Sequence, residues 1–233
     1  MMNVTSMIST REQDMIRKKS RRSGVAPATT VDYRKEFRHL YSGSEKKVEI
    51  VHAPKMNYIA LDGIGDPLTS GGLVAAADVL CRVSLELRLA VSRAEVMDFS
   101  VMPLETIWWS DDPERPSLQG SDPRWTAMIM QPVISPGMLE DALARLGKES
   151  SASPLLREIR LVRFYEGLAA QTFARSGEPC CAAALDRINR YIAENGYEPR
   201  GAIHEVFLDG FCIDPGPKSQ RILRQPVLAA SAT

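Results

Sequence analysis

The segment MIMQPV at residues 128–133 has a close copy, ILRQPV, at residues 222–227. In both, apolar residues typical of a buried β-strand run into Gln-Pro-Val, and Gln131 and Gln225 are 94 positions apart. A match of three residues carries little weight by itself. It gains weight because the segments upstream of the two copies match as well.

Upstream of each copy lies a strand-like segment with one glutamate inside it. The first is LETIWW at residues 104–109, and the second is HEVFLD at residues 204–209. Glu105 and Glu205 are 100 positions apart, and a longer polar loop at 111–124 accounts for the difference from the Gln-Pro-Val spacing. We expect the two glutamates to be equivalent residues near a pseudo-twofold axis, with a ligand groove between the halves.

The elements ahead of each glutamate follow the same order of strand, glycine-containing turn and long helix. Apolar residues recur every three or four positions at 73–91, and residues 179–195 have an apolar face of the same kind. A shorter helix is expected at 136–146, and strands are expected at 48–52, 56–62, 98–102, 105–110, 125–133, 159–164, 168–174, 202–209 and 222–227. The pattern predicts an α+β protein with two ββαβ-like halves, at about 48–133 and 159–227.

The composition excludes several classes of protein. With 233 residues the chain has room for one large domain or two small ones. It has 29 basic and 29 acidic residues, and this neutral balance is not typical of a protein dominated by phosphate binding. No apolar run reaches the roughly 18–20 residues of a membrane span, and the N-terminus lacks the apolar core of a signal peptide. We therefore expect a soluble cytoplasmic protein that binds neither nucleic acid directly nor a membrane.

Residues 1–31 are expected to form a flexible N-terminal extension, because they show no sustained periodicity. Their basic cluster at 17–22 is the alternative signal of a nucleic-acid arm, which the neutral charge and the absence of interleaved aromatic residues disfavour. The folded body is expected at 32–227, followed by a tail at 228–233. The four cysteines form no CxxC pair, so neither a disulfide scaffold nor a zinc site is indicated.

Glu105 and Glu205 are the candidate catalytic residues. A carboxylate inside a mostly apolar strand is either partly buried, which raises its pKa and suits it to general-base catalysis, or it faces solvent on an alternating strand. The sequence leaves both interpretations open for each residue. The presence of the same feature in both halves favours the first.

Aromatic residues surround these glutamates. Strand alternation puts Trp109 on the face of Glu105 and Trp108 on the opposite face, and it puts Phe207 on the face of Glu205. An acidic groove with aromatic walls suits flat, aromatic or cationic ligands. The alternative is that these rings belong to the core.

Other motifs of known chemistry are missing from the sequence. The three histidines, His39, His52 and His204, form no HxxxH or HxH pair, so we expect no metal site and no cofactor. His204 is interpreted as a half-buried strand residue. Gly63 and Gly65 lack the third glycine of a dinucleotide-binding fingerprint.

Seven segments together resemble the GyrI-like small-molecule-binding domains, named for a gyrase inhibitor, and in particular their standalone subgroup. In family order, they are APKMNYIALDGIGDP (53–67), VMPLETIWW (101–109), MIMQPV (128–133), PLLREI (154–159), GLAAQTF (167–173), AIHEVFLD (202–209) and ILRQPV (222–227). The resemblance covers residues 32–227. It implies two pseudo-symmetric α+β halves, an SHS2-type repeat, that share a curved antiparallel sheet. It also implies that the central groove of this sheet binds bulky aromatic or cationic compounds against a buried glutamate.

The resemblance also implies site residues. Glu205 falls at the place of the buried glutamate, and the family pattern PLExxW is matched by Glu105 and Trp108. The candidate substrate-binding residues are Trp108, Trp109, Phe207, Tyr58, Phe173 and Tyr165. The family usually has a His-x-Gly-Pro-Tyr-like turn after GLAAQTF, whereas residues 174–179 of this chain are shorter and lack both His and Tyr. Tyr165 or Tyr58 would have to replace that tyrosine.

Three functions follow from the resemblance. Some standalone members are similar to hydrolases that open the cyclopropane of DNA-alkylating cyclopropanoid natural products, which implies a cofactor-independent hydrolase for antibiotic self-resistance or detoxification. The second function is a module that sequesters or senses a drug-like ligand without turnover. The third is an interaction protein for a larger partner such as gyrase. We expect the hydrolase, acting as a monomer or weak homodimer on a small molecule.

Overall fold

The computed structural model describes residues 30–65, 71–94, 97–109, 124–175, 182–209 and 220–229. The N-terminal extension up to residue 29, the loop at 111–123, the turn at 176–179 and the last four residues lie outside the described residues. The predictions made for those segments therefore stay predictions.

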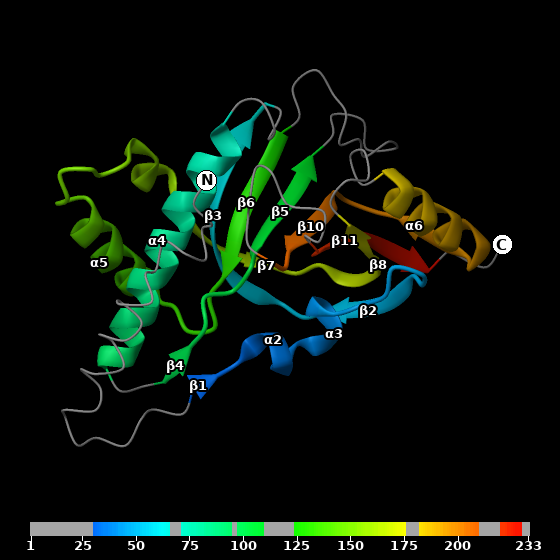
Figure 1. The fold of residues 1–233 in the computed structure, drawn as a ribbon, viewed down its shortest axis with the longest axis horizontal. Helices are drawn as coiled ribbons and strands as arrows, with labels where there is room; N and C mark the ends of the chain where they lie inside the picture. Colours follow the sequence, from blue (N-terminus) through cyan, green and yellow to red (C-terminus); the bar gives the residue numbers. More distant parts are fainter. Residues whose placement is uncertain are drawn as a thin grey trace.

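One large sheet forms the centre of the molecule (Figure 1). Its strands are β2 (Glu49–Ala53), β3 (Met56–Ile64), β5 (Leu104–Trp109), β6 (Arg124–Met130), β7 (Arg160–Phe164), β8 (Gly167–Arg175), β9 (Tyr197–Pro199), β10 (Ile203–Phe207) and β11 (Gln220–Ala229). The other described elements are β1 (Thr30–Val31), α2 (Tyr33–Glu36), α3 (Arg38–Tyr41), α4 (Gly72–Arg93), β4 (Asp98–Phe99), α5 (Pro136–Leu146), η2 (Pro154–Glu158) and α6 (Ala182–Glu194). The described strands and long helices fall where the sequence predicts them, except that β1, β9 and η2 were not expected.

The order of the strands is symmetric about the centre of the sheet. Eight strands follow the order β2-β8-β11-β10-β5-β6-β3-β7, and β9 pairs with the end of β11. β5 and β10 are the central pair, and β5 continues outward into β6 and β3 of its own half as β10 continues into β11 and β8. A pseudo-twofold axis between β5 and β10 therefore exchanges the halves. The predicted α+β class, with two pseudo-symmetric halves and one curved antiparallel sheet, is confirmed.

The outermost strands are exchanged between the halves. β2 precedes β3 in the chain but pairs with β8, and β7 precedes β8 but pairs with β3. Only residues 54–55 separate β2 from β3, and only residues 165–166 separate β7 from β8. Strands at opposite ends of the sheet are thus joined by linkers that span at most about 10 Å. The sheet must curl, and the rings of Phe164 in β7 and His204 in β10 have centroids 6.1 Å apart although three strands lie between them.

One face of the sheet, here called the helix face, carries the two long helices. α4 packs over β3 and β6, and α6 packs over β8 and β11 (Figure 1). Gln131, at the end of β6, donates a hydrogen bond of 2.9 Å from Nε2 to Ser84 Oγ in α4. The pseudo-twofold axis is perpendicular to the sheet, so it places α6 on the same face as α4.

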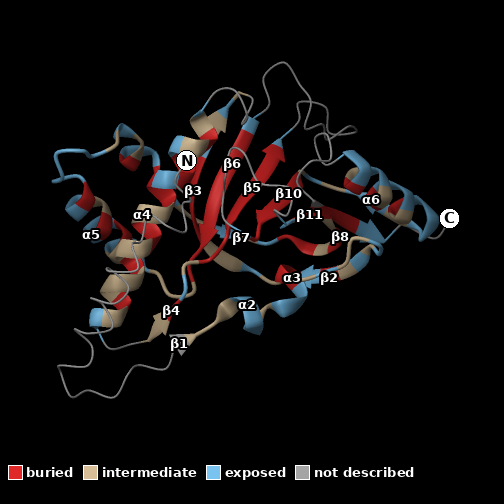
Figure 2. Cartoon of the chain, viewed as in Figure 1, coloured by how far each residue is buried: buried red, intermediate tan, exposed pale blue. Residues whose placement is uncertain are grey.

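The opposite face is concave and is crossed by residues 33–44, here called the strap. The strap contains α2 and α3, and its start is tied down by the parallel pair of β1 and β4. Leu40 and Tyr41 of the strap are buried against the sheet. Figure 2 shows that the central strands are buried along most of their length. We call this second face the strap face.

The ladder register corrects one predicted equivalence. Met128 in β6 and Ile222 in β11 each lie three residues before the glutamine of Gln-Pro-Val. Met128 pairs with Glu105, whereas Ile222 pairs with Val206. The counterpart of Glu105 in the second half is therefore Val206, and the prediction that it is Glu205 was wrong.

The same register separates the two glutamates in space. Glu205 in β10 pairs with Thr106, the residue after Glu105 in β5. Paired residues share a face and consecutive residues face opposite sides, so Glu105 projects to the strap face and Glu205 to the helix face. Both lie beside the pseudo-twofold axis, as expected, but they do not line one groove.

Candidate functional site

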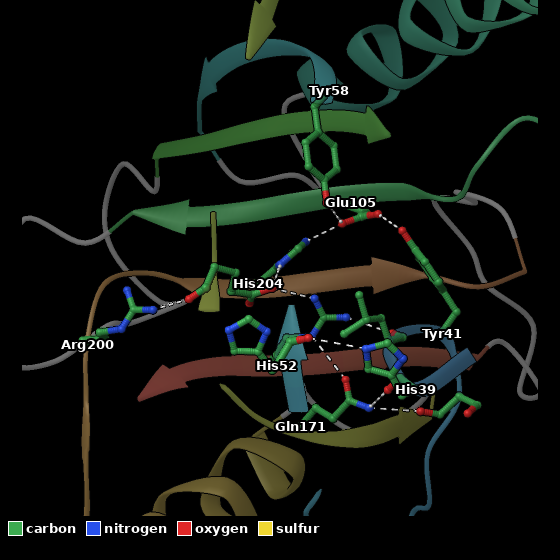
Figure 3. Close-up of polar contacts among 12 residues, drawn as sticks. His39, Tyr41, His52, Tyr58, Glu105, Gln171, Arg200 and His204 are labelled. Atoms are coloured by element: carbon green, nitrogen blue, oxygen red, sulfur yellow. Dashed lines mark hydrogen bonds and ion pairs between the residues drawn. The ribbon is translucent and has the colours of Figure 1, made fainter. Parts of the chain in front are cut away.

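On the strap face, three side chains contact the carboxylate of Glu105. The Tyr41 hydroxyl donates to Glu105 Oε1 at 2.8 Å, and the Tyr58 hydroxyl donates to Oε2 at 3.3 Å. His204 Nε2 lies 2.9 Å from Oε2. Figure 3 shows these side chains converging from the strap and from β3, β5 and β10. Every one of them is at most 6% exposed.

A second carboxylate extends this cluster. Glu166, in the short linker between β7 and β8, lies 3.1 Å from His204 Nδ1 and accepts a hydrogen bond of 2.6 Å from Arg224 Nη1. Arg224 also donates to the strap carbonyl of Leu40 at 2.8 Å and to Gln171 Oε1 at 3.2 Å. Two carboxylates, one imidazole and one guanidinium therefore form a buried strap-face network.

The charges in this network stabilise one another. Burial alone would lower the pKa of His204, but the carboxylates of Glu166 and Glu105 raise it to about 9. Burial alone would raise the pKa of Glu166, but Arg224 and His204 lower it to about 2. Burial and the charge of Glu105 raise the pKa of the Tyr41 and Tyr58 hydroxyls well above the usual value, so both remain donors.

The network holds the strap on the sheet. With His204 protonated, two negative and two positive groups balance. The sheet side chains also bind main-chain carbonyls of the strap, since Gln171 Nε2 donates to His39 at 2.7 Å and to Ser42 at 3.1 Å. This arrangement is suited to closing the concave face.

On the helix face, Glu205 has aromatic neighbours and a different cation. The Trp108 indole donates from Nε1 to Glu205 Oε2 at 3.1 Å, and Arg221 Nη1 donates to Oε1 at 2.9 Å. The guanidinium carbon of Arg221 lies 5.1 Å from the centre of the Phe207 ring, a cation–π arrangement. These four residues, together with Thr106, are here called the Glu205 cluster.

Thr106 brings an unused hydroxyl to this cluster. It is fully buried, it pairs directly with Glu205 in the ladder, and its Oγ1 has no hydrogen-bond partner among the described residues. Paired residues in adjacent strands have Cβ atoms about 4.5–5.5 Å apart. A buried hydroxyl left unpaired beside a carboxylate is the kind of group that a bound water or a ligand oxygen would satisfy.

A glycine in β3 makes room for the ring of Trp125, the ladder partner of Trp108. Trp108 pairs with Trp125 in β6, and Trp125 pairs with Gly63 in β3. A Cβ on Gly63 would lie 2.1 Å from the Trp125 ring, so only glycine leaves room for that ring over β3. The Trp125 indole donates from Nε1 to the Gly65 carbonyl at 3.2 Å.

The remaining predicted residues lie apart from the Glu205 cluster. Trp109 is on the strap face, half exposed, and donates to Thr126 at 3.0 Å. Phe173 is also on the strap face and lies beside Gly43 of the strap. Tyr165 is exposed in the β7–β8 linker, with its hydroxyl 3.2 Å from His52 Nε2.

The structure thus brings Glu205, Trp108 and Phe207 together on one face, and Glu105 and Tyr58 together on the other. The residues that sequence reasoning missed are Tyr41, Glu166, Arg224, Arg221 and Thr106, and His204 is fully buried rather than half-buried. Arg224 had a detectable signal, since it is a charged residue inside an apolar strand at the place where the other copy has Met130. The described residues contain no cluster of His, Cys, Asp and Glu that could hold a metal ion.

The α+β architecture, with its open curved antiparallel sheet, matches the GyrI-like fold. In a comparison with solved structures, the chain is similar to an uncharacterized conserved protein from Listeria innocua, with 25% identity, a TM-score of 0.74, and coverage of 85% of this chain and 100% of that one. It is similar to a hydrolase from the same organism at 25% identity and a TM-score of 0.71, again over 85% and 100% of the two chains. A further structure of a Listeria innocua hydrolase gives 25% identity and a TM-score of 0.74 over 86% and 100%.

No protein-family model matches the chain, and neither does any curated protein. Among the helices that the structure describes, none has the length and apolar character needed to cross a membrane.

Proposed function

We propose that this chain binds flat aromatic small molecules at the Glu205 cluster and hydrolyses strained electrophiles among them, of which cyclopropanoid DNA-alkylating natural products are the class implied by the family resemblance. The observation that carries the proposal is the arrangement of Glu205 beside Thr106, with Trp108 and Phe207 on the same face. The similarity to Listeria innocua proteins described as hydrolases supports a hydrolytic reaction.

The reaction needs one water and no cofactor. Glu205 and the Thr106 hydroxyl hold the water, and Glu205 accepts its proton as the oxygen attacks the cyclopropane methylene. The ring C–C bond breaks, and its electron pair moves into the conjugated ketone, whose oxygen becomes a phenolate. The phenolate then takes a proton, so the product is the substrate plus one water. The rings of Trp108 and Phe207 hold the flat substrate against the carboxylate.

Glu105 has a different role in this proposal. It lies on the strap face and binds Tyr41, Tyr58 and His204, so it does not share the water with Glu205. Its function is to hold the strap. Glu205 is the catalytic residue, and Trp108 and Phe207 are the substrate-binding residues, whereas Trp109, Phe173, Tyr58 and Tyr165 do not contact the ligand.

Binding without turnover is the second candidate function of the same site. It is favoured by the burial of Glu205, whose side chain is 4% exposed and whose two oxygens each accept a hydrogen bond. A protein of this kind would give resistance by sequestering the ligand. In both cases the cytoplasmic location, the monomeric or weakly dimeric state and the absence of nucleic-acid contacts stay predictions from the sequence.

The two functions are separated by one reaction followed by mass spectrometry. Wild-type protein is incubated with a spiro-cyclopropyl cyclohexadienone, and the gain of one water is measured against buffer alone. Glu205→Gln keeps the size of the side chain but accepts no proton at neutral pH, so turnover is expected to fall at least about 100-fold. Glu105→Gln is the matched control on the opposite face, assayed at a temperature where circular dichroism shows it folded.

Each outcome of this reaction has one meaning. Retention of the unreacted compound by the wild type, without gain of water, supports sequestration. Hydrolysis at the wild-type rate by Glu205→Gln overturns the assignment of Glu205 as the base.

A further inference from the structure

A carboxylate flanked by aromatic faces is the chemistry by which proteins bind organic cations. The Glu205 cluster has such a carboxylate and aromatic rings, but the guanidinium of Arg221 already contacts them. Arg221 Nη1 lies 2.9 Å from Glu205 Oε1, and the guanidinium carbon lies 5.1 Å from the Phe207 ring centre. The guanidinium therefore sits where the charged group of a cationic ligand would lie.

We propose that the Arg221 guanidinium occupies the place beside Glu205 and Phe207 that the charged group of a cationic ligand would take. It thereby makes this protein select uncharged flat ligands over cationic ones. The inference rests on the proposed function, because it takes the Glu205 cluster as the ligand site, and it names the charge class of the substrate. It makes Arg221 a specificity-determining residue.

The electrostatic argument is direct. A cationic ligand at Glu205 has either to displace the guanidinium or to lie next to it. Displacement breaks an ion pair whose partners are only 18% and 4% exposed, and it leaves the guanidinium without that carboxylate. Juxtaposition places two like charges a few ångströms apart in a poorly hydrated place, where they repel. An uncharged aromatic ligand faces neither cost, because it can stack on the rings with the ion pair intact.

The fold itself does not require an arginine here. Arg221 pairs with Phe207, and the equivalent pair in the first half is Ala127 with Thr106. Ala127 is fully buried in the same sheet position, so the repeated architecture accepts a small uncharged side chain at this rung. The positive charge is a feature of the second half alone, next to the carboxylate that it neutralises.

The test compares two probes of nearly equal shape, acridine and N-methylacridinium, in mildly alkaline buffer where acridine is uncharged. Dissociation constants are measured by fluorescence for wild type, Arg221→Met and the control Arg160→Met. Arg160 is a half-exposed arginine paired with Asp62 on the strap face. We expect wild type and Arg160→Met to bind acridine at least about tenfold more tightly than the cation. Arg221→Met is expected to bind the cation at least about tenfold more tightly than wild type does.

The outcomes separate the inference from the function on which it rests. Equal affinity of the wild type for both probes overturns the inference, and this reading does not depend on the folding of any variant. A folded Arg221→Met that gains no affinity for the cation overturns it as well. If neither probe binds any of the three proteins, the proposed ligand site itself is refuted, and the inference with it.

Discussion

A buried glutamate has different surroundings on the strap face and on the helix face. Glu105 and Glu205 lie in neighbouring central strands, on adjacent rungs of one ladder. On the strap face, Glu105 is bound by two tyrosine hydroxyls and an imidazole in a network that also binds the strap. On the helix face, Glu205 is held by an indole and a guanidinium next to a hydroxyl that has no partner within the described part of the chain. The comparison teaches that one residue of register separates a structural glutamate from a candidate catalytic one.

The two halves differ as strongly as the two faces. Following the register, Tyr58 corresponds to Gln171 and Met130 to Arg224, whereas Glu205 corresponds to Leu104. The backbone is duplicated, but the charged members of both clusters come mainly from the second half. The symmetric fold therefore carries an asymmetric distribution of charge.

The largest expected effect on stability comes from removing the cation of the strap-face network. Arg224→Met places the side chain found at the equivalent position of the first half, but it leaves Glu166 without its guanidinium. Breaking a buried pair in this way is expected to lower the free energy of unfolding by about 3–5 kcal/mol in urea denaturation. The control Arg160→Met breaks an exposed pair and is expected to cost less than about 1 kcal/mol. Equal costs for the two variants would contradict the structural role given to the strap face.

The pH dependence of stability tests the same face. The pKa of His204 is raised in the folded state to about 9, so its contribution is complete below its ordinary pKa of 6.5 and is lost as pH rises through 9. The pKa of Glu166 is lowered to about 2, so its contribution is complete above its ordinary value of 4.5 and is lost as pH falls through 2.

Unfolding free energy should therefore be highest between these two ordinary values. It should fall above neutral pH by at most about 1.4 kcal/mol per pH unit for one proton. In His204→Gln the alkaline fall should be shallower than in the wild type. An unchanged slope in that variant would remove His204 from the explanation.

The two tyrosines that donate hydrogen bonds to Glu105 provide a test with smaller, graded effects on stability. Tyr41 donates at 2.8 Å and Tyr58 at 3.3 Å, so the shorter bond should contribute more. Tyr41→Phe is expected to lower the free energy of unfolding by about 1.5–3 kcal/mol, the range for hydrogen bonds to charged groups, and Tyr58→Phe by less. Thermal denaturation of both variants measures the order, and the reverse order would show that the strap is not held through Tyr41.

The smallest expected effect concerns Thr106 on the helix face. Thr106→Val keeps the shape and removes a buried hydroxyl that has no partner among the described residues, so stability should stay equal or rise. Turnover should fall about tenfold, which corresponds to about 1.4 kcal/mol, because the water loses one of its two contacts. A variant that loses stability and keeps full turnover would place Thr106 in the core instead of the site.

The sequence predicts the fold better than the site, for reasons visible in single residues. Periodicity located α4 and α5 closely, and alternation correctly separated Trp108 from Trp109. The equivalence of Glu105 and Glu205 failed because the spacing between strands does not reveal their register, and a shift of one residue reverses the face. Glu166 could not be found, since a linker residue reaches the network only after the sheet has curled.

The exchanged outer strands have a consequence for how the protein is made. During synthesis, β3 has no outer strand neighbour among the described strands until residues 160–164 of β7 have left the ribosome, and β2 has no described strand to pair with until β8 follows. The first half therefore cannot complete its sheet while it is the only part translated. Expressed as a separate fragment, it would present an unpaired edge on β3 and a free β2, which complement each other between two copies. We expect such a fragment to form a homodimer in which the two copies exchange β2. Gene duplication followed by fusion would turn that dimer into the single chain.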